Sequence, residues 1–566
     1  MSVKGCWPAA ARLLATAGVS AVFGLPGDDL DALAAVTEAD IHFTLCRDQR
    51  NAVFMATGYA MQSGDLGVAV VGKGPAVTNT VTGLLEASRS AAPVLLISGG
   101  TSAQHVGSGA FQELDQLSLI RPLVKWAARV DHPSRLVPLL RRAMLVARGG
   151  TPGPVYVELP DHLLGEEIPL PAGSIRAERP ASVGLSADSS ALAALHASQR
   201  PIVLVGGGMR HRNAGHLVER FAEAYGAAIM CTASGRGVVD ESSPLFCGLA
   251  GLYTPEAVTP LWDDTDCVLA VGSRIEETAS YGWPEAVGKE VPVIQVNVEP
   301  GEFSTEFAGP LVLGDAGVVL DAWLAKAVGR PSDWADRISA VHQDLRAAHR
   351  DSLRTLRADN RLHIAEVLDA LATVLPADRI LVQENGLQDM WSYRFPVYAC
   401  DGAAGSVVPS EQTSLGFGAA AAVGVKRAAP DRPVVAFVGD GAFALFDADL
   451  PTAVAEGGVL YVVLRNGGYG WLQSQLDGRE RPVPGHAFVD PAMVVGVAPE
   501  LPRLHQITVA DKASLLADVT EAWKRCAEGQ VVVVNVPVRM EDAMFGADKA
   551  GGDFPVLPGV EDERSR

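Results

Sequence analysis

The feature that most constrains this chain is a rhythm that recurs in three successive blocks. Each block repeats an apolar run rich in Val, Ile and Leu, a glycine-rich turn, and a helical pattern. The runs include LGVAVVGKG and APVLLISGG in the first block, PIVLVGGG and DCVLAVGS in the second, and PVVAFVGDGA and LYVVLRNGG in the third. Continuous apolar strands that alternate with helices are typical of parallel sheets covered on both faces. The sequence therefore predicts an α/β protein with three doubly wound parallel-sheet domains.

The segments between the blocks predict the domain boundaries. Residues 168–198 lose strand character and gain Pro, Ser and Ala, which indicates a linker. Residues 329–360 are charged and helical without strands, so we expect a helical connector there. The expected order is a first domain at 1–170, a central domain at 190–330, the connector at 331–360, a third domain at 361–541 and a flexible tail at 542–566.

Charge and cysteine usage narrow the class of function. Lys and Arg total 46 and Asp and Glu total 66, a net charge of −20 that disfavours binding to nucleic acid or anionic lipid. No apolar run reaches the roughly 20 residues that span a bilayer. The seven cysteines are scattered, odd in number and without metal-ligand spacing, which fits reduced thiols. We expect a cytoplasmic protein that binds neither nucleic acid nor membrane.

The sharpest chemical signal lies at the ends of two runs in the third block. One run ends at Gly439-Asp440-Gly441, and the next ends at Asn466, with Gly468 two residues on. Ligands of open α/β sheets bind at the carboxyl ends of strands, and the 26-residue separation of Asp440 and Asn466 leaves room for a helix and a returning strand. Glycines let a ligand approach the backbone, and the N–H groups that open the next helix attract phosphate. A carboxylate, an amide oxygen, a backbone carbonyl and diphosphate oxygens suit Mg²⁺.

This pattern resembles the Mg²⁺–diphosphate motif of the thiamine-diphosphate-dependent enzymes, in which a GDG is followed by an Asn at a similar distance. The resemblance implies thiamine diphosphate as cofactor and Mg²⁺ held by Asp440, Asn466 and the carbonyl of Gly468. The family usually has two adjacent Asn residues, and Asn466 matches the second, metal-binding one. The other cofactor-binding positions implied here are Gly439, Gly441, Ala442, Phe443 and Tyr469, with the backbone N–H groups of Ala442 and Phe443 at the diphosphate.

Two further stretches of the third block resemble the same family. NGLQDMW resembles the loop that touches the diphosphate, with Gly386 at the matching glycine and Gln388 as a candidate contact. EQTSLGFGAAAAVGV resembles the segment that precedes GDG. The resemblance implies that Leu415 is the bulky residue that wedges the cofactor into its bent form. The carbonyl of Thr413 would then face the 4′-amino group of the aminopyrimidine.

The first block resembles acetolactate synthases and their relatives through VFGLPGDDLDAL, GAFQE and PVYVELP. In acetolactate synthases and hydroxyacyl-CoA lyases the Phe-Gln pair lies near the substrate, which implies that role for Phe111 and Gln112. The loop that usually reads TSGPGATN is GKGPAVTN here, so Lys73 adds a cation. Lys73 either meets a substrate carboxylate or phosphate or points to solvent.

One departure concerns the glutamate that exchanges a proton with N1′ of the aminopyrimidine in most of the family. Counting back without gaps from the GYA at residues 58–60 places Gln49 at that position, with Asp48 one residue upstream. An amide holds the ring by a hydrogen bond but is no carboxylate acid–base group. We favour the hypothesis that Gln49 occupies the position and activation is slow or uses other groups. A bulge that brings Asp48 to N1′ and a loss of turnover are the two alternatives.

The resemblance spans about residues 7 to 540 and carries further expectations. Relatives use the central domain for FAD, for ADP or for neither, and FAD is not favoured here. Because the family binds its cofactor between the first domain of one chain and the third domain of another, we expect a homodimer or homotetramer with shared active sites. The implied activity is an acetolactate synthase-like decarboxylation and carboligation of a small 2-oxo acid. The alternatives are a 2-oxo acid decarboxylase, a 2-hydroxyacyl-CoA lyase acting on an acyl substrate, and a non-catalytic homologue that binds thiamine diphosphate.

Overall fold

The chain folds into three six-stranded sheets, and the strands of each sheet all run parallel, so the predicted α/β class with three doubly wound domains is confirmed. The computed structural model describes residues 2–27, 29–171, 189–212, 214–327, 333–358, 362–477 and 501–538. The predicted tail at 542–566 and most of the predicted linker lie outside these described residues. The domain boundaries given above stay predictions.

The first domain carries the sheet of order β3-β2-β4-β5-β7-β6. Its strands are β2 (Ala21–Leu25), β3 (His42–Leu45), β4 (Gly67–Val71), β5 (Val94–Gly100), β6 (Trp126–Arg129) and β7 (Val155–Pro160). Its helices are α1 (Cys6–Thr16), α2 (Leu30–Glu38), α3 (Gln49–Ser63), α4 (Pro75–Thr78), α5 (Val81–Arg89), α6 (Gln116–Ile120) and α7 (Leu136–Arg148). A separate antiparallel pair joins β1 (Ser2–Lys4) to β8 (Glu167–Pro169).

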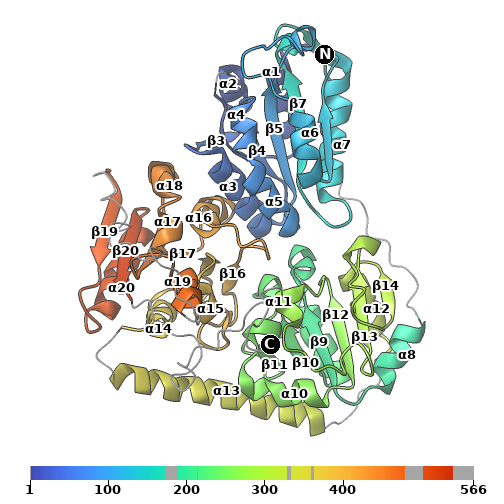
Figure 1. Cartoon of the computed structure of the whole chain (residues 1–566), viewed down its shortest axis with the longest axis vertical. Helices are drawn as coiled ribbons and strands as arrows, with labels where there is room; N and C mark the ends of the chain where they lie inside the picture. The colour runs from blue at the N-terminus through green and yellow to red at the C-terminus, as the bar shows by residue number, and fades with distance from the viewer. Residues whose placement is uncertain are drawn as a thin grey trace.

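The central domain carries the sheet of order β11-β10-β9-β12-β13-β14. Its strands are β9 (Pro201–Val205), β10 (Ala228–Cys231), β11 (Phe246–Leu249), β12 (Cys267–Val271), β13 (Val293–Asn297) and β14 (Leu311–Leu313). Its helices are α8 (Ser189–Ala197), α9 (Gly215–Tyr225), α10 (Thr259–Asp264), α11 (Glu277–Ser280) and α12 (Ala316–Leu324). The long helix α13 (Asp333–Ala358) follows and runs along the base of both the central and the third domain, yellow in Figure 1.

The third domain carries the sheet of order β16-β15-β17-β18-β20-β19. Its strands are β15 (Ile380–Gln383), β16 (Gly405–Val407), β17 (Val434–Gly439), β18 (Val459–Arg465), β19 (Leu504–Thr508) and β20 (Val531–Pro537). Its helices are α14 (Ile364–Val374), α15 (Leu387–Tyr393), α16 (Phe417–Ala428), α17 (Asp440–Phe443), α18 (Leu450–Glu456), α19 (Gly470–Asp477) and α20 (Leu515–Ala527). The long apolar runs of the sequence became β17, β18 and β20, which are buried along nearly their whole length.

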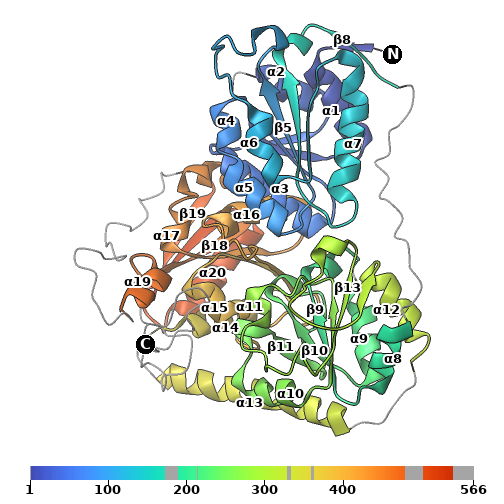
Figure 2. The same ribbon diagram turned by 45° about the vertical axis from the view of Figure 1, so that its right-hand side comes forward.

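The most extensive contact between the first and third domains is the helix pair α3 and α16, which lie side by side in Figures 1 and 2. The helices approach so closely that a Cβ at Gly424 would lie 1.8 Å from the carbonyl oxygen of Met55, and one at Gly58 would lie 2.4 Å from that of Ala421. Small residues therefore set the distance between the two domains. Apolar side chains of both domains form one continuous core across this contact.

Two further observations concern the surface and the thiols. Among the described residues, no helix is long and apolar enough to cross a bilayer. All seven cysteines are buried and none is in a disulfide. The wide apolar interior of each domain thus accounts for their burial, because an unpaired cysteine packs as a small hydrophobic residue.

Candidate active site

The residues predicted to bind the metal meet at the carboxyl ends of β17 and β18, which are neighbours in the sheet. The Asp440 carboxylate is 1% exposed, and its two oxygens accept hydrogen bonds of 2.8 Å from the N–H groups of Gly441 and Gly467. The side-chain oxygen of Asn466 accepts a bond of 3.3 Å from the N–H of Gly468. Burial raises the pKa of Asp440, against which these N–H donors act. This set of oxygens fits a hard cation such as Mg²⁺, which would also neutralise the buried charge.

The backbone beside Asp440 forms a cradle that only glycine permits. A Cβ at Gly441 would lie 2.6 Å from the ring of Tyr469, which covers that position. Gly386 has a φ of 146°, and the side-chain oxygen of Gln388 lies close to both Gly386 and Gly439. The glycines at 386, 439 and 441, with Gln388 and Tyr469 beside them, therefore form one stretch of close backbone, which fits a diphosphate approaching the main chain.

Ala442 and Phe443 follow in α17 and are buried. The Phe443 ring packs on Tyr461 at a centroid distance of 5.5 Å, so its side chain belongs to the core. Their N–H groups lie in the first turn of a helix, where no intrahelical acceptor is available. Gln388 is held by bonds from its amide to the carbonyls of Glu384 and Asn385, at 3.2 and 2.9 Å.

The predicted wedge segment lies between β16 and α16. Thr413 is exposed and has a φ of 45°, while Leu415 is half-buried between two buried neighbours, Ser414 and Gly416. The segment thus leaves Thr413 and part of Leu415 accessible between buried neighbours. A bulky side chain projecting from a fixed loop suits the bending of a two-ring cofactor.

Gln49 begins α3, and Asp48 is the N-cap residue of that helix. The Asp48 carboxylate accepts a bond of 2.7 Å from the N–H of Arg50 and lies 3.6 Å from the Arg50 guanidinium. The side-chain oxygen of Gln49 accepts a bond of 3.0 Å from the amide of Asn79, at the end of α4. Asp48 therefore caps the helix, and among the described residues nothing accepts a hydrogen bond from the NH₂ group of Gln49.

The other candidates of the first domain lie around the opposite end of α4. A Cβ at Gly74 would lie 2.6 Å from the carbonyl oxygen of Gln112, so Gln112 sits against the start of the helix whose end holds Gln49. Phe111 is 71% exposed, a fraction that leaves its ring free to cover a ligand or a partner surface. The Lys73 ammonium lies 2.5 Å from the Asp161 carboxylate and is thereby paired within its own domain.

Among the described residues, no hydrogen bond or ion pair joins Gln49 or Gln112 to the group around Asp440. The start of α3 instead meets Asp449, which accepts bonds of 2.6 Å from the N–H of Arg47 and 2.8 Å from the amide of Asn51.

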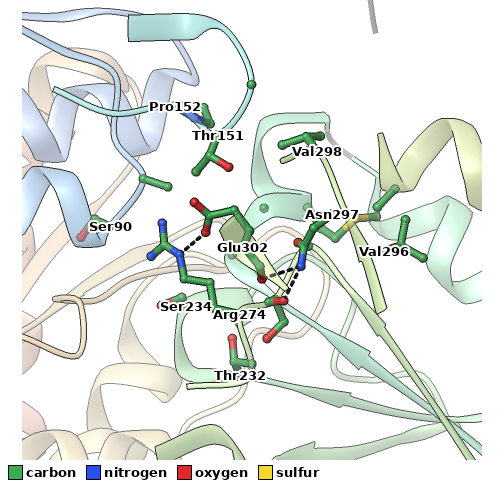
Figure 3. A pocket seen from close by; sticks show the side chains of 18 of the residues that line it. Ser90, Thr151, Pro152, Thr232, Ser234, Arg274, Val296, Asn297, Val298 and Glu302 are labelled. Carbon is green, nitrogen blue, oxygen red and sulfur yellow. Dashed lines mark hydrogen bonds and ion pairs between the residues drawn. The ribbon is translucent and has the colours of Figure 1, made fainter. Parts of the chain in front are cut away.

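A cavity of about 490 Å³ lies between the carboxyl ends of the central strands and the first domain (Figure 3). Its size is typical of small-molecule sites. Arg274 spans it, paired with the Glu302 carboxylate and donating 2.7 Å to the carbonyl of Arg89. Asn297 donates 2.9 Å to the carbonyls of Ser273 and Glu302. The polar groups of this wall are thus largely satisfied by one another.

Three residues that the sequence analysis missed support the candidates. Asn79 orients Gln49, while the fully buried Glu86 and Glu384 accept N–H bonds from the segment around Leu415. Glu384 directly follows a buried strand and precedes the glycine loop, which was a usable signal. In the sequence, Glu86 looks like any other acidic residue on an amphipathic helix. Its partner Ser410 is 324 residues away in sequence, so no local pattern could reveal the contact.

Comparison with known proteins identifies each domain separately. The chain matches the models described as the thiamine pyrophosphate enzyme N-terminal TPP binding domain at residues 8–119, the central domain at 189–323, and the C-terminal TPP binding domain at 384–536. It is 32% identical over 460 residues to a probable 2-ketoarginine decarboxylase of Pseudomonas aeruginosa, covering 79% of this chain and 78% of that protein.

Two acetolactate synthases are also similar. The large subunit from Parasynechococcus marenigrum is 29% identical over 469 residues, covering 79% of this chain and 74% of that protein. The isozyme 3 large subunit of Escherichia coli is 27% identical over 574 residues, covering 96% of each. The similarity therefore extends through all three domains rather than one shared module.

Proposed function

The chain belongs to the thiamine pyrophosphate enzymes that act on 2-oxo acids, and we propose that it catalyses an acetolactate synthase-like reaction: a 2-oxo acid loses CO₂ and the remaining acyl unit is joined to an acceptor carbonyl. The observation that carries the proposal is the joint arrangement of Asp440, Asn466 and the glycine cradle at two adjacent strand ends. When bound, thiamine diphosphate supplies a carbon nucleophile, and its thiazolium ring stabilises the negative charge that remains on the acyl carbon when CO₂ leaves.

The residues of this chain would hold and orient that cofactor. Asp440, Asn466 and the carbonyl of Gly468 would hold Mg²⁺, and the backbone at Gly441 and Ala442 would face the diphosphate. Leu415 and the Thr413 carbonyl would fix the aminopyrimidine from the third domain. Gln49 would donate a hydrogen bond from its NH₂ group to the ring, because its oxygen already accepts from Asn79.

We place the complete active site between two chains. Among the described residues of one chain, no hydrogen bond or ion pair joins the aminopyrimidine candidates Gln49 and Gln112 to the diphosphate candidates around Asp440, which agrees with a second copy completing each site. The proposal is therefore a homodimer or a homotetramer with shared sites. We also place the enzyme in the cytoplasm, which agrees with seven unpaired thiols.

We propose that turnover needs no flavin. Loss of CO₂ and carbon–carbon bond formation leave no net electrons to transfer, and the central wall of Arg274, Glu302 and Asn297 is largely satisfied internally. Protein dialysed until it has no absorbance near the flavin band should regain full activity with thiamine diphosphate and Mg²⁺ alone. Activity that returns only when FAD is added would contradict this.

The test of function is a panel of ¹³C-labelled 2-oxo acids, with and without acceptor aldehydes and 2-oxo acids, followed by ¹³C NMR of the released products. A labelled 2-hydroxy-3-oxo product, formed only with thiamine diphosphate and Mg²⁺, is expected. Asp440→Ala should abolish cofactor retention and product together. Full activity of that variant would remove the cofactor assignment.

Simple decarboxylation is the second candidate. It is favoured by the similarity to the probable 2-ketoarginine decarboxylase. The same panel separates the two, because a decarboxylase releases the aldehyde in place of the joined product. The panel therefore includes 2-oxo acids with a cationic side chain.

A further inference from the structure

The segment 410–418, which carries Leu415, is held on both sides by buried carboxylates from two domains. Glu86 of α5 is fully buried, and its two oxygens accept N–H bonds of 2.5 Å from Ser410 and 3.2 Å from Ser414. The acid comes from the first domain, whereas the accepted N–H groups belong to the third. The carboxylate thus satisfies buried donors of another domain.

Glu384, at the end of β15, repeats this arrangement on the other side of Leu415. It is also fully buried, and its two oxygens accept N–H bonds of 3.2 Å from Gly416 and 2.8 Å from Gly418. Each carboxylate therefore holds two N–H groups, and the four donors flank Leu415 on both sides in sequence. A buried N–H group left without an acceptor is costly, so these four bonds stabilise the loop around Leu415.

The backbone of the segment between Glu86 and Glu384 is strained at Thr413. Thr413 has a φ of 45°, which non-glycine residues adopt rarely, and such a backbone persists only where its surroundings over-determine it. The N–H of Thr413 donates 2.8 Å to the carbonyl of Ser410, so the turn closes directly on the residue that Glu86 holds. Removing Glu86 would leave two buried N–H groups unsatisfied and free this turn to relax.

We propose that Glu86 and Glu384 form a carboxylate clamp that presets the Leu415 wedge, and that Glu86 is a positioning residue through which the first domain of each chain shapes the cofactor loop of its own third domain. The proposal rests on the proposed function, because it assigns Leu415 to the bending of thiamine diphosphate. The clamp acts on the aminopyrimidine half of the cofactor. The diphosphate half is held elsewhere, by Asp440 and the glycine cradle.

Because the two halves of the cofactor are held by different residues, a test can distinguish positioning of Leu415 from a general structural role of Glu86. Calorimetry with Mg²⁺ compares the Kd of thiamine diphosphate with that of its thiazolium diphosphate fragment, which lacks the aminopyrimidine and needs no bend. Glu86→Ala should raise the Kd of the whole cofactor about tenfold, because two buried N–H groups of the loop lose their acceptor. The Kd of the fragment should stay within about twofold of the wild-type value.

Two further variants serve as controls for the Glu86→Ala result. Glu86→Gln keeps the volume and one acceptor oxygen, so it should fold if Glu86→Ala does not, with an intermediate rise in the Kd of the whole cofactor. Ser90→Ala removes the hydroxyl that donates 3.1 Å to the same carboxylate without touching the loop, and it should leave the ratio of the two Kd values unchanged.

A second readout needs no cofactor. Amide hydrogen exchange of the peptide that contains 410–418 should accelerate in Glu86→Ala relative to wild type, and it should not in Ser90→Ala. Unchanged exchange, or equal losses of affinity for whole cofactor and fragment, would overturn the clamp. Wild-type protein that binds neither molecule would overturn the proposed function, even where the exchange responds.

Discussion

At the scale of single residues, Gln49 is the most informative position. Its amide cannot act as a carboxylate acid–base group, so Gln49→Glu should accelerate exchange of the thiazolium C2 proton of bound thiamine diphosphate by about 10²-fold or more, the usual worth of a positioned acid–base group. Acid-quenched proton NMR measures this rate.

The matched control is Asp48→Asn. Asparagine caps a helix about as well as aspartate, so α3 keeps its start while the carboxylate is lost. We expect the exchange rate to stay at the wild-type value. A clear fall would assign the acid–base role to Asp48 and contradict the place given to Gln49.

The buried acid Glu384 makes stability depend on pH. Burial raises its pKa from the model-compound value of 4.5 to about 8, more than the N–H groups of Gly418, Asn385 and Gly416 lower it, and Glu86 adds to the rise. The folded protein therefore binds a proton that the unfolded chain releases above 4.5. This contribution to stability is full below pH 4.5 and is lost as pH rises through about 8.

We therefore expect Glu384→Gln to flatten the stability profile between pH 5 and pH 8, with a change in slope of at most about 1.4 kcal/mol per pH unit. Urea unfolding at several pH values within that window measures the slope. Glu285→Gln is the comparison, since Glu285 is exposed and its pKa is lowered by Lys289. An equal slope for wild type and Glu384→Gln would contradict the raised pKa.

Some of the candidate site residues could be predicted from the sequence, and others could not. Asp440 and Asn466 could be paired because each ends an apolar run, and strand order then brings them together. Glu86 could not be found, because its function depends on the packing of α5 against a loop of another domain. The sequence left open whether Lys73 meets a substrate or points to solvent. Its ion pair with Asp161 became visible only in the folded chain.

At the scale of elements, the contact of α3 with α16 depends on two glycines. Gly424→Val should destabilise the protein by about 1–3 kcal/mol, the usual cost of overpacking, because its side chain would collide with the backbone of Met55. Urea unfolding measures the loss. Gly165→Ala, where nothing lies within 4 Å of an added Cβ, should change stability by less than about 0.5 kcal/mol.

The elements themselves were the most predictable part of the fold. Runs such as VVAFV and LYVVL are too apolar for any place but a buried parallel strand, and they formed β17 and β18. The pairing of α3 with α16 was not predictable, because the glycines of both helices read as ordinary small residues until the helices meet.

At the scale of the whole molecule, the proposed sharing of each active site by two chains predicts complementation between chains. Gln49→Trp should block the first-domain half of a site, and Asp440→Ala should block the third-domain half. A mixed dimer then contains one site with two intact halves, so co-expression should restore about a quarter of wild-type activity by random pairing.

Each variant expressed alone is the control and should be nearly inactive. Activity assays on co-purified chains with two different affinity tags measure the recovery. No recovery in a mixed dimer that has been isolated as such would show that each site is completed within a single chain.

The clamp around Leu415 has a consequence for recombination between relatives. A chimera that joins the third domain of this chain to the first domain of a relative exchanges the side chain that meets Ser410 and Ser414, although both donors are retained. The cofactor affinity of such a hybrid should therefore depend on which relative supplied the first domain. Hybrids that keep an acidic residue at the position of Glu86 should retain cofactor binding.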